Sequence, residues 1–150
     1  MFFNRSKSYK SELFNEKTFY EKFLKDLELA KKEVVIESPY ITANRMETFN
    51  HVFQRILNKK IKIHLITRDP VEHDDEYLKH QAVNEILRCK ELGMQLTLLN
   101  GYHHRKLAFI DRKILWEGSL NILSYNKSLE IMRRIEDESS VRQMLRFIKL

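Results

Sequence analysis

The sequence alternates between stretches in which apolar residues recur every three to four positions and short, continuous apolar runs. The first pattern predicts amphipathic helices over residues 15–32, 45–58 and 76–92. The second pattern predicts buried strands over residues 34–36, 61–66 and 94–99, one after each helix. Strands separated by helices tend to pair in parallel, so this order favours an α/β fold.

A different pattern begins after Gly101. Two strand-like runs, residues 106–111 and 114–117, are joined by Asp111-Arg112-Lys113 and predict a β-hairpin. A further strand over residues 129–135 and a helix ending near residue 148 complete the chain. Helix-strand alternation followed by a hairpin predicts an α/β sandwich, in which helices flank a mixed β-sheet.

The length of 150 residues suits one domain with one hydrophobic core. We expect a single domain over residues 1–150, in which residues 1–14 form a loosely ordered N-terminal segment. The chain shows neither a signal peptide nor an apolar run of membrane-spanning length. This favours a cytoplasmic protein without stable membrane insertion.

The charge balance is basic, with 27 Lys and Arg against 21 Asp and Glu and a formal net charge of +6. Such a balance favours polyanionic partners, namely nucleic acid or an acidic lipid surface. A modest positive charge that only improves solubility is the alternative.

The residues that carry chemistry are concentrated in one segment near the predicted hairpin. One residue separates His104 from Lys106, and four residues separate Lys106 from Asp111. After six further residues comes Gly118-Ser119-x-Asn121. Residues i and i+2 of an extended strand point to the same side, so His104 and Lys106 should project together. By the same alternation, Leu107 and Phe109 should point into the core.

The residue types in this segment suit attack on a phosphodiester. A nucleophilic histidine beside a fixed cation matches an anionic substrate. Gly118 allows a close approach of backbone or phosphate, and Ser119 and Asn121 offer neutral hydrogen-bond donors for phosphoryl oxygens. Asp111 lies at the hairpin turn, where a structural role fits at least as well as a chemical one.

The spacing of these residues resembles the HKD signature of the phospholipase D superfamily. The resemblance implies that the predicted α/β sandwich has the phospholipase D-like fold. It also implies that His104 is the nucleophile, that Lys106 and Asn121 stabilise the phosphoryl oxygens, and that Glu130 accepts a hydrogen bond from His104. The reaction implied needs no metal and no other cofactor. Sequence spacing agrees, because no His-Glu-x-x-His pattern is present.

The chain carries one HKD motif, although phosphodiester cleavage through a covalent intermediate needs both a nucleophile and an acid. The short bacterial endonucleases of the superfamily solve this by symmetric dimerisation, which implies a homodimer here. Two copies of His104 would then face each other across one phosphorus atom, one forming a phosphohistidine and the other protonating the leaving oxygen. The neighbouring His103 should point to the other face and be structural.

These observations favour a nuclease, with DNA preferred over RNA as the substrate. Arg105, Lys113 and Lys127 are candidates to contact the phosphate backbone, although Arg105 fits a solvated surface charge equally well. A lipid phosphodiesterase or phosphatidyl transferase remains an alternative, as does a non-catalytic nucleic-acid-binding module of the same fold. The chain also fits one part of a larger nuclease system.

Overall fold

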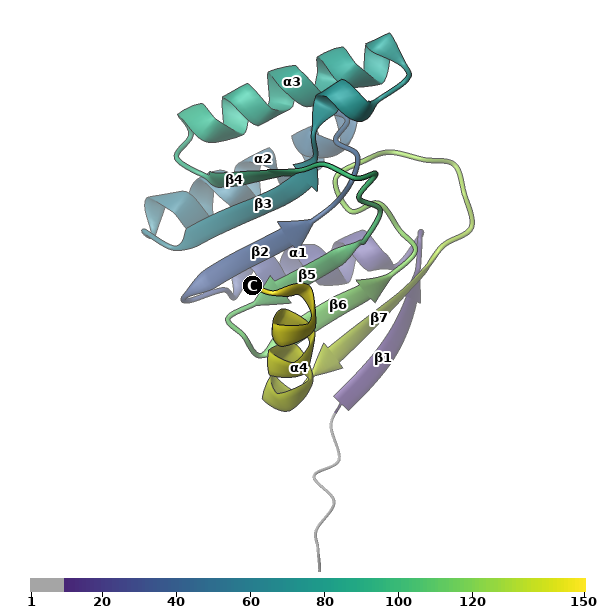
Figure 1. The fold of residues 1–150 in the computed structure, drawn as a ribbon. Coiled ribbons are helices and arrows are strands. Elements are labelled where there is room, and N and C mark those ends of the chain that lie inside the picture. Colours follow the sequence, from purple (N-terminus) through teal and green to yellow (C-terminus); the bar gives the residue numbers. More distant parts are fainter. Residues whose placement is uncertain (1–9) are drawn as a thin grey trace, which may run out of the picture.

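A seven-stranded mixed β-sheet organises the chain in the computed structural model, which describes residues 10–150 (Figure 1). The strands are β1 (Lys10–Asn15), β2 (Glu33–Glu37), β3 (Lys62–Arg68), β4 (Gln95–Leu99), β5 (Leu107–Ile110), β6 (Ile114–Gly118) and β7 (Ile131–Glu136). The helices are α1 (Phe19–Glu28), α2 (Ala43–Asn58), α3 (Glu76–Glu91) and α4 (Glu138–Ile148), with a short 3-10 helix at Pro70–Glu72.

The strand order is β1-β7-β6-β5-β2-β3-β4, and it confirms the predicted mixed sheet flanked by helices. Strands β2, β3 and β4 are parallel, while β5, β6, β7 and β1 pair antiparallel. The hairpin of β5 and β6 forms where the sequence predicts it. Because β5 also pairs with β2, β5 becomes the central strand of the sheet.

The carboxyl ends of β2, β3, β4 and β6 and the amino ends of β5 and β7 lie at the same end of the sheet. We call this end of the sheet the site edge. The register shows this alignment, since Glu37 lies opposite Leu107 and Leu107 lies opposite Glu117. Ligand sites in sheets with parallel strands lie outside the carboxyl ends of those strands. The residues before β5 therefore occupy the place where a site is expected.

The N-terminal segment differs from its prediction. Residues 10–14 are not loosely ordered but belong to β1, which pairs antiparallel with β7. Phe14 anchors this strand by packing on Trp116, with ring centroids 5.0 Å apart. The strand is largely exposed at the edge of the sheet, so its sequence lacks the apolar run of a buried strand. Residues 1–9 lie outside the described part of the chain.

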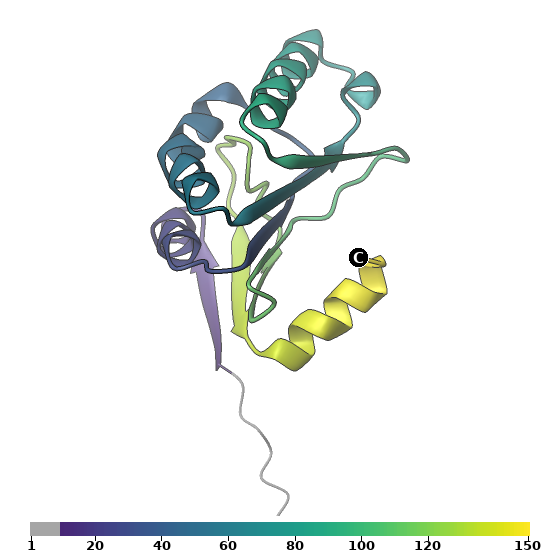
Figure 2. The same cartoon turned by 90° about the vertical axis from the view of Figure 1, so that its left-hand side faces the viewer.

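Helices cover the two faces of the sheet unequally (Figure 2). Helices α1, α2 and α3 cover one face, and α4 alone lies against the other. Leu107 and Phe109 both enter the α4-side core, as predicted, where they pack with Val141 and Leu145. Burial of each such side chain stabilises the fold by roughly 1.5–3 kcal/mol. Within residues 10–150, no helix has the length and apolar character needed to cross a bilayer.

Candidate active site

His104 and Lys106 lie side by side at the site edge, as the spacing predicts. The Lys106 Nζ is 2.6 Å from His104 Nδ1 and also donates to the His104 carbonyl oxygen at 2.7 Å. His104 is exposed, whereas Lys106 is buried. The result is an accessible imidazole next to a cation whose position is fixed by the backbone of the same segment.

The residues on either side of His104 are held by the ends of β2 and β3. Glu37 is fully buried, and its Oε1 accepts hydrogen bonds from His103 Nε2 and Arg105 Nε, each at 2.7 Å. Arg68 donates two hydrogen bonds to the His103 carbonyl oxygen, at 3.1 and 2.9 Å. His103 is therefore structural, as predicted, and it positions the next residue.

Tyr40 completes the surroundings of His104, and sequence reasoning did not identify its role. Its ring meets the His104 ring edge-on at a centroid distance of 6.3 Å and stacks on His73 at 5.2 Å. Its hydroxyl accepts a hydrogen bond from Arg68 Nη1 at 3.2 Å. Tyr40 follows β2 and Arg68 ends β3, so their position at the carboxyl ends of parallel strands was the available signal.

The electrostatic surroundings keep His104 neutral to lower pH than usual. Burial lowers its pKa below the ordinary value of 6.5, and the positive charges of Lys106 and Arg68 and the neighbouring His103 lower it further. Burial also lowers the pKa of Lys106, an effect that Glu130 opposes and Arg68 reinforces. A depressed pKa favours the unprotonated imidazole, which is the form that can act as a nucleophile.

Substitution of Lys106 by methionine should raise the pKa of His104. The substitution removes a nearby positive charge that disfavours the imidazolium, so protonation becomes easier and the titration moves to higher pH. Titration of the imidazole protons by NMR measures this shift directly. Lys113→Met is the matched control, because Lys113 lies at the opposite end of the hairpin. An equal shift in both variants would contradict a specific effect of Lys106.

Gly118, Ser119 and Glu130 form the junction between β6 and β7. A Cβ atom added to Gly118 would lie 2.1 Å from the Ile131 carbonyl oxygen, which confirms that glycine permits a close backbone approach here. The Ser119 hydroxyl accepts from the Ile131 amide at 3.0 Å and donates to the Glu130 carboxylate. Ser119 is thus engaged in holding the junction.

Glu130 does not meet the expectation of a hydrogen bond to His104 within one chain. Its two carboxylate oxygens accept hydrogen bonds from the hydroxyls of Ser119 and Ser128. The negative charge of Glu130 raises the pKa of Lys106, against the larger effect of burial. Orientation of His104 by Glu130 therefore remains a prediction that requires a rearrangement or a second copy of the chain.

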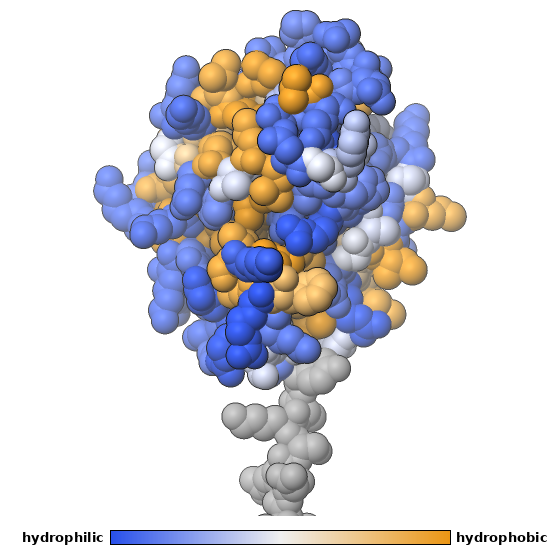
Figure 3. Space-filling view, in the orientation of Figure 1, coloured by the Kyte–Doolittle hydropathy of each residue, from blue (hydrophilic) through white to orange (hydrophobic). Residues whose placement is uncertain are grey.

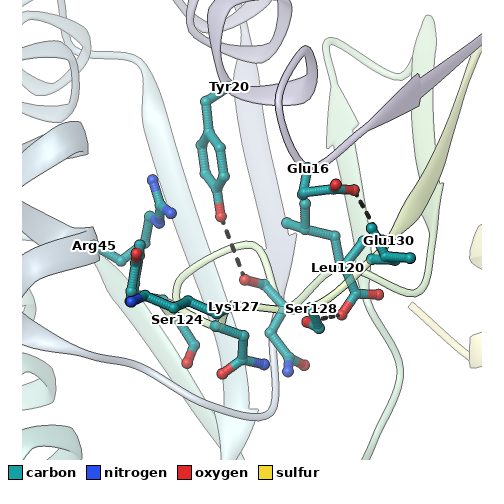
Figure 4. A pocket seen from close by; sticks show the side chains of 12 residues that line it. Glu16, Tyr20, Arg45, Leu120, Ser124, Lys127, Ser128 and Glu130 are labelled. Atoms are coloured by element: carbon teal, nitrogen blue, oxygen red, sulfur yellow. Dashed lines mark hydrogen bonds between the residues drawn. The ribbon is translucent and has the colours of Figure 1, made fainter.

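Asn121 lies on the wall of a pocket of about 400 Å³ formed mainly by the loop between β6 and β7 (Figure 4). Its side chain is buried, and its Oδ1 has no hydrogen-bond partner among the described residues. Lys127 and Glu130 line the same pocket. The fold thus brings three of the predicted site residues together around one cavity.

Asp111 and Lys113 lie away from this region, which corrects their placement among the site residues. The Asp111 carboxylate accepts hydrogen bonds from the backbone amides of Lys31, Lys32 and Glu33, at 2.9, 2.7 and 3.1 Å. It therefore fixes the turn between α1 and β2. Strand β5 separates Asp111 from Lys106, and five residues of extended chain span roughly 16 Å.

Arg105 is near His104, but it is not an isolated surface charge, because its Nε donates to the buried Glu37. Its side chain is still 45% exposed, which leaves part of the guanidinium accessible to an anion. Within residues 10–150, no group of three or more His, Cys, Asp or Glu side chains is arranged to hold a metal ion.

Comparison with known families identifies the chain. The family model described as "Cardiolipin synthase, PLD-like domain" matches residues 23–149, which is most of the sequence. The chain belongs to the phospholipase D-like family. No curated protein sequence matches this PLD-like chain.

Solved structures share the PLD-like fold at low sequence identity. NucT from Helicobacter pylori superposes with a TM-score of 0.71 at 17% identity, covering 95% of this chain and 94% of that one. Nuc from Salmonella typhimurium, a phospholipase D family member, gives 0.73 at 14% identity, covering 93% and 91%. The phosphatidylserine synthase of Haemophilus influenzae gives 0.66 at 15% identity, covering 94% and 37%. Family and fold together support phosphodiesterase chemistry in general.

Proposed function

We propose that this PLD-like chain is a metal-independent nuclease that cleaves DNA at a site shared by two protomers. The single observation that carries the proposal is the contact between His104 and Lys106 at the site edge, 2.6 Å between Nδ1 and Nζ. It pairs an accessible nucleophile with a cation suited to a phosphate. The basic charge balance and the accessible part of Arg105 suit the repeated phosphates of a nucleic-acid strand.

The proposed reaction has two steps. A ring nitrogen of one neutral His104 attacks phosphorus and forms an N–P bond, while the P–O bond to the leaving oxygen breaks. The imidazolium of His104 of the partner subunit gives its proton to that oxygen. The same partner imidazole then takes a proton from water, whose oxygen displaces the histidine from phosphorus and restores both rings.

Lys106 has to exchange partners when substrate binds. Its ammonium donates to His104 Nδ1 in the free protein, so a neutral ring carries its own proton on Nε2. Attack through Nε2 requires that proton to move to Nδ1, which is possible once Lys106 turns toward the phosphoryl oxygens. The depressed pKa of Lys106, due first to burial, marks an ammonium that gains from an anionic partner.

The face that bears α4 carries the surface that supports dimerisation. A groove beside Lys106 is lined by apolar side chains, among them Leu13, Ile131 and Phe147, which are 63%, 64% and 79% exposed. Figure 3 shows apolar side chains gathered on this face. One protomer supplies the nucleophile of the proposed reaction but not its general acid. An apolar surface next to such a site suits a second copy of the chain, which would supply that acid.

Phe147→Asp should convert the dimer into monomers and lower activity in parallel. A charge buried in the apolar centre of an interface costs about 2 kcal/mol or more, which is roughly a thirtyfold weaker association. Light scattering across protein concentrations measures the change. Leu29→Asp is the control, because Leu29 is comparably exposed, at 73%, but follows α1 on the opposite face. A monomeric Phe147→Asp protein with full activity would refute the shared site.

Substrate class is tested by parallel assays of the wild-type protein. We expect cleavage of DNA, weaker cleavage of RNA and no hydrolysis of phosphatidylcholine or phosphatidylglycerol vesicles. Turnover should be unchanged in excess EDTA. Loss of turnover on chelation with rescue by a divalent ion would overturn the metal-free mechanism, and preferential lipid hydrolysis would favour the phosphatidyl transferase class instead.

A further inference from the structure

The pocket beside Asn121 contains a cation that the proposed mechanism does not use. Arg45 lies in the first turn of α2, and its guanidinium is stacked 3.7 Å from the centroid of the Tyr20 ring. The Tyr125 ring is 5.4 Å away. The Nε atom of Arg45 is buried and has no hydrogen-bond partner among the described residues. A buried donor without a partner is costly, so this arrangement calls for an acceptor.

The acidic residues of the pocket do not supply that acceptor. Glu16 Oε2 accepts from the Glu130 amide at 2.9 Å, and Glu130 accepts from two serine hydroxyls. Figure 4 shows Glu16 and Glu130 together on the side of the pocket away from Arg45. The pocket therefore has one acidic wall, already engaged, and one cationic wall that is not.

The start of α2 adds to the positive character of the cationic wall. Its first turn contains no acidic residue, and the Thr42 side chain makes no capping hydrogen bond to it. The Thr42 hydroxyl instead accepts from the Tyr125 amide at 2.9 Å, which ties the β6–β7 loop to the helix start. A cation at the positive end of a helix dipole is unfavourable by itself. An anion bound there would relieve both charges.

We infer that this pocket, the Arg45 pocket, binds a nucleotide of the substrate strand. The phosphate of this nucleotide is the neighbour of the phosphate that is cleaved. This inference rests on the proposed function. Asn121 belongs both to the HKD motif and to the pocket wall, which links the pocket to the motif that carries the proposed reaction. Its volume of about 400 Å³ suits a ligand of nucleotide size.

The composition of the pocket fits such a nucleotide. The Arg45 guanidinium takes the flanking phosphate with its fork of N–H donors, and Lys127 lines the same pocket as a second cation. The exposed ring of Tyr125 offers a stacking surface for a base. The buried, unpartnered Oδ1 of Asn121 accepts from a base amino group.

A second phosphate site also distinguishes the two substrate classes. A phospholipid with a single phosphodiester places its one phosphate at His104 and has nothing anionic left for Arg45. A nucleic-acid strand repeats its phosphates, so it can supply one phosphate to His104 and another to Arg45. The observations therefore favour a nucleic-acid strand over a membrane lipid.

The test compares two substrates that differ in the flanking phosphate. Bis(4-nitrophenyl) phosphate carries only the scissile phosphate, whereas a short single-stranded oligodeoxynucleotide carries neighbours. For Arg45→Ala, kcat/KM on the oligonucleotide should fall roughly ten- to a hundredfold further than on the small diester. The loss should be mainly in KM. Arg45→Lys should recover only part of it, because lysine lacks the planar fork.

Arg55→Ala is the matched control, since Arg55 is on the same helix but pairs at the surface with Glu28. Binding gives a second readout: in a His104→Ala background, the salt dependence of oligonucleotide affinity should decrease by about one unit of slope for Arg45→Ala. Equal losses on both substrates would overturn the inference. So would displacement of the oligonucleotide by phosphatidylglycerol vesicles that depends on Arg45. A wild-type protein inactive on both substrates would refute the proposed function itself.

Discussion

Replacement of His104 by alanine should lower phosphodiester turnover by about four orders of magnitude or more, without unfolding the protein. The imidazole is exposed and fills no core space, so its removal should leave the fold intact. The loss reflects removal of both the nucleophile and the acid, because each protomer supplies one of them. Steady-state cleavage of DNA, with circular dichroism as a folding check, measures the effect. His51→Ala, which removes an exposed histidine on α2, is the control.

Mixed dimers make the same substitution a test of the shared site. If nucleophile and acid come from different protomers, only a dimer with two intact His104 residues turns over. An equal mixture of wild-type and His104→Ala subunits, after full exchange, should retain about a quarter of the wild-type activity. Independent sites would retain about a half. Linear dependence of activity on the wild-type fraction would end the shared-site proposal.

The largest effect on stability should come from Asp26→Ala. Asp26 and Arg134 are both buried, and the Asp26 carboxylate accepts from Arg134 Nε at 2.7 Å and Nη2 at 3.0 Å. It also accepts from Trp116 Nε1 at 2.9 Å. Its removal leaves the indole donor without a partner, and it leaves the buried guanidinium with a single ion pair, from Arg134 Nη1 to the half-exposed Glu136 at 3.1 Å. We expect the free energy of unfolding to fall by about 3–5 kcal/mol.

Chemical denaturation measures this loss, and the chain provides a matched control. Glu28→Ala removes a carboxylate from the same helix, two residues further on, where it pairs with Arg55 at 2.7 Å on the surface. Such an exposed pair contributes at most about 1 kcal/mol. The double substitution Asp26→Leu with Arg134→Met should recover most of the lost stability, because it leaves no buried charge. A loss for Asp26→Ala no larger than that for Glu28→Ala would contradict this account.

Sequence periodicity was enough to predict the strands and helices of the α/β core, and local spacing was enough to predict the contact between His104 and Lys106. Both depend on residues close together in the chain. Asp111 belongs to the motif and Lys113 to the hairpin turn next to it, but both lie beyond a strand that carries them to the far end of the sheet. Motif membership alone does not show on which end of a strand a residue lies.

The parts that sequence reasoning missed depend on long-range pairing. Tyr40 meets His104 and Arg68 holds His103 only because β2, β3 and β5 align their ends. Arg45 reaches the pocket because the β6–β7 loop is tied to the start of α2. β1 is an exposed edge strand, and what identifies it is its pairing with β7. No short window of sequence contains these relationships.

The central position of β5 has a consequence for how the site moves. Amides of a strand bonded on both sides exchange with solvent only when the sheet opens as a whole. His104 and Lys106 directly precede such a strand, so the nucleophile is attached to the part of the molecule that opens last. Asn121 and Lys127 stand instead in the β6–β7 loop, outside any strand. Hydrogen exchange should therefore be slowest at Ala108 and Phe109 and much faster across the loop, where adjustment to an incoming strand would take place.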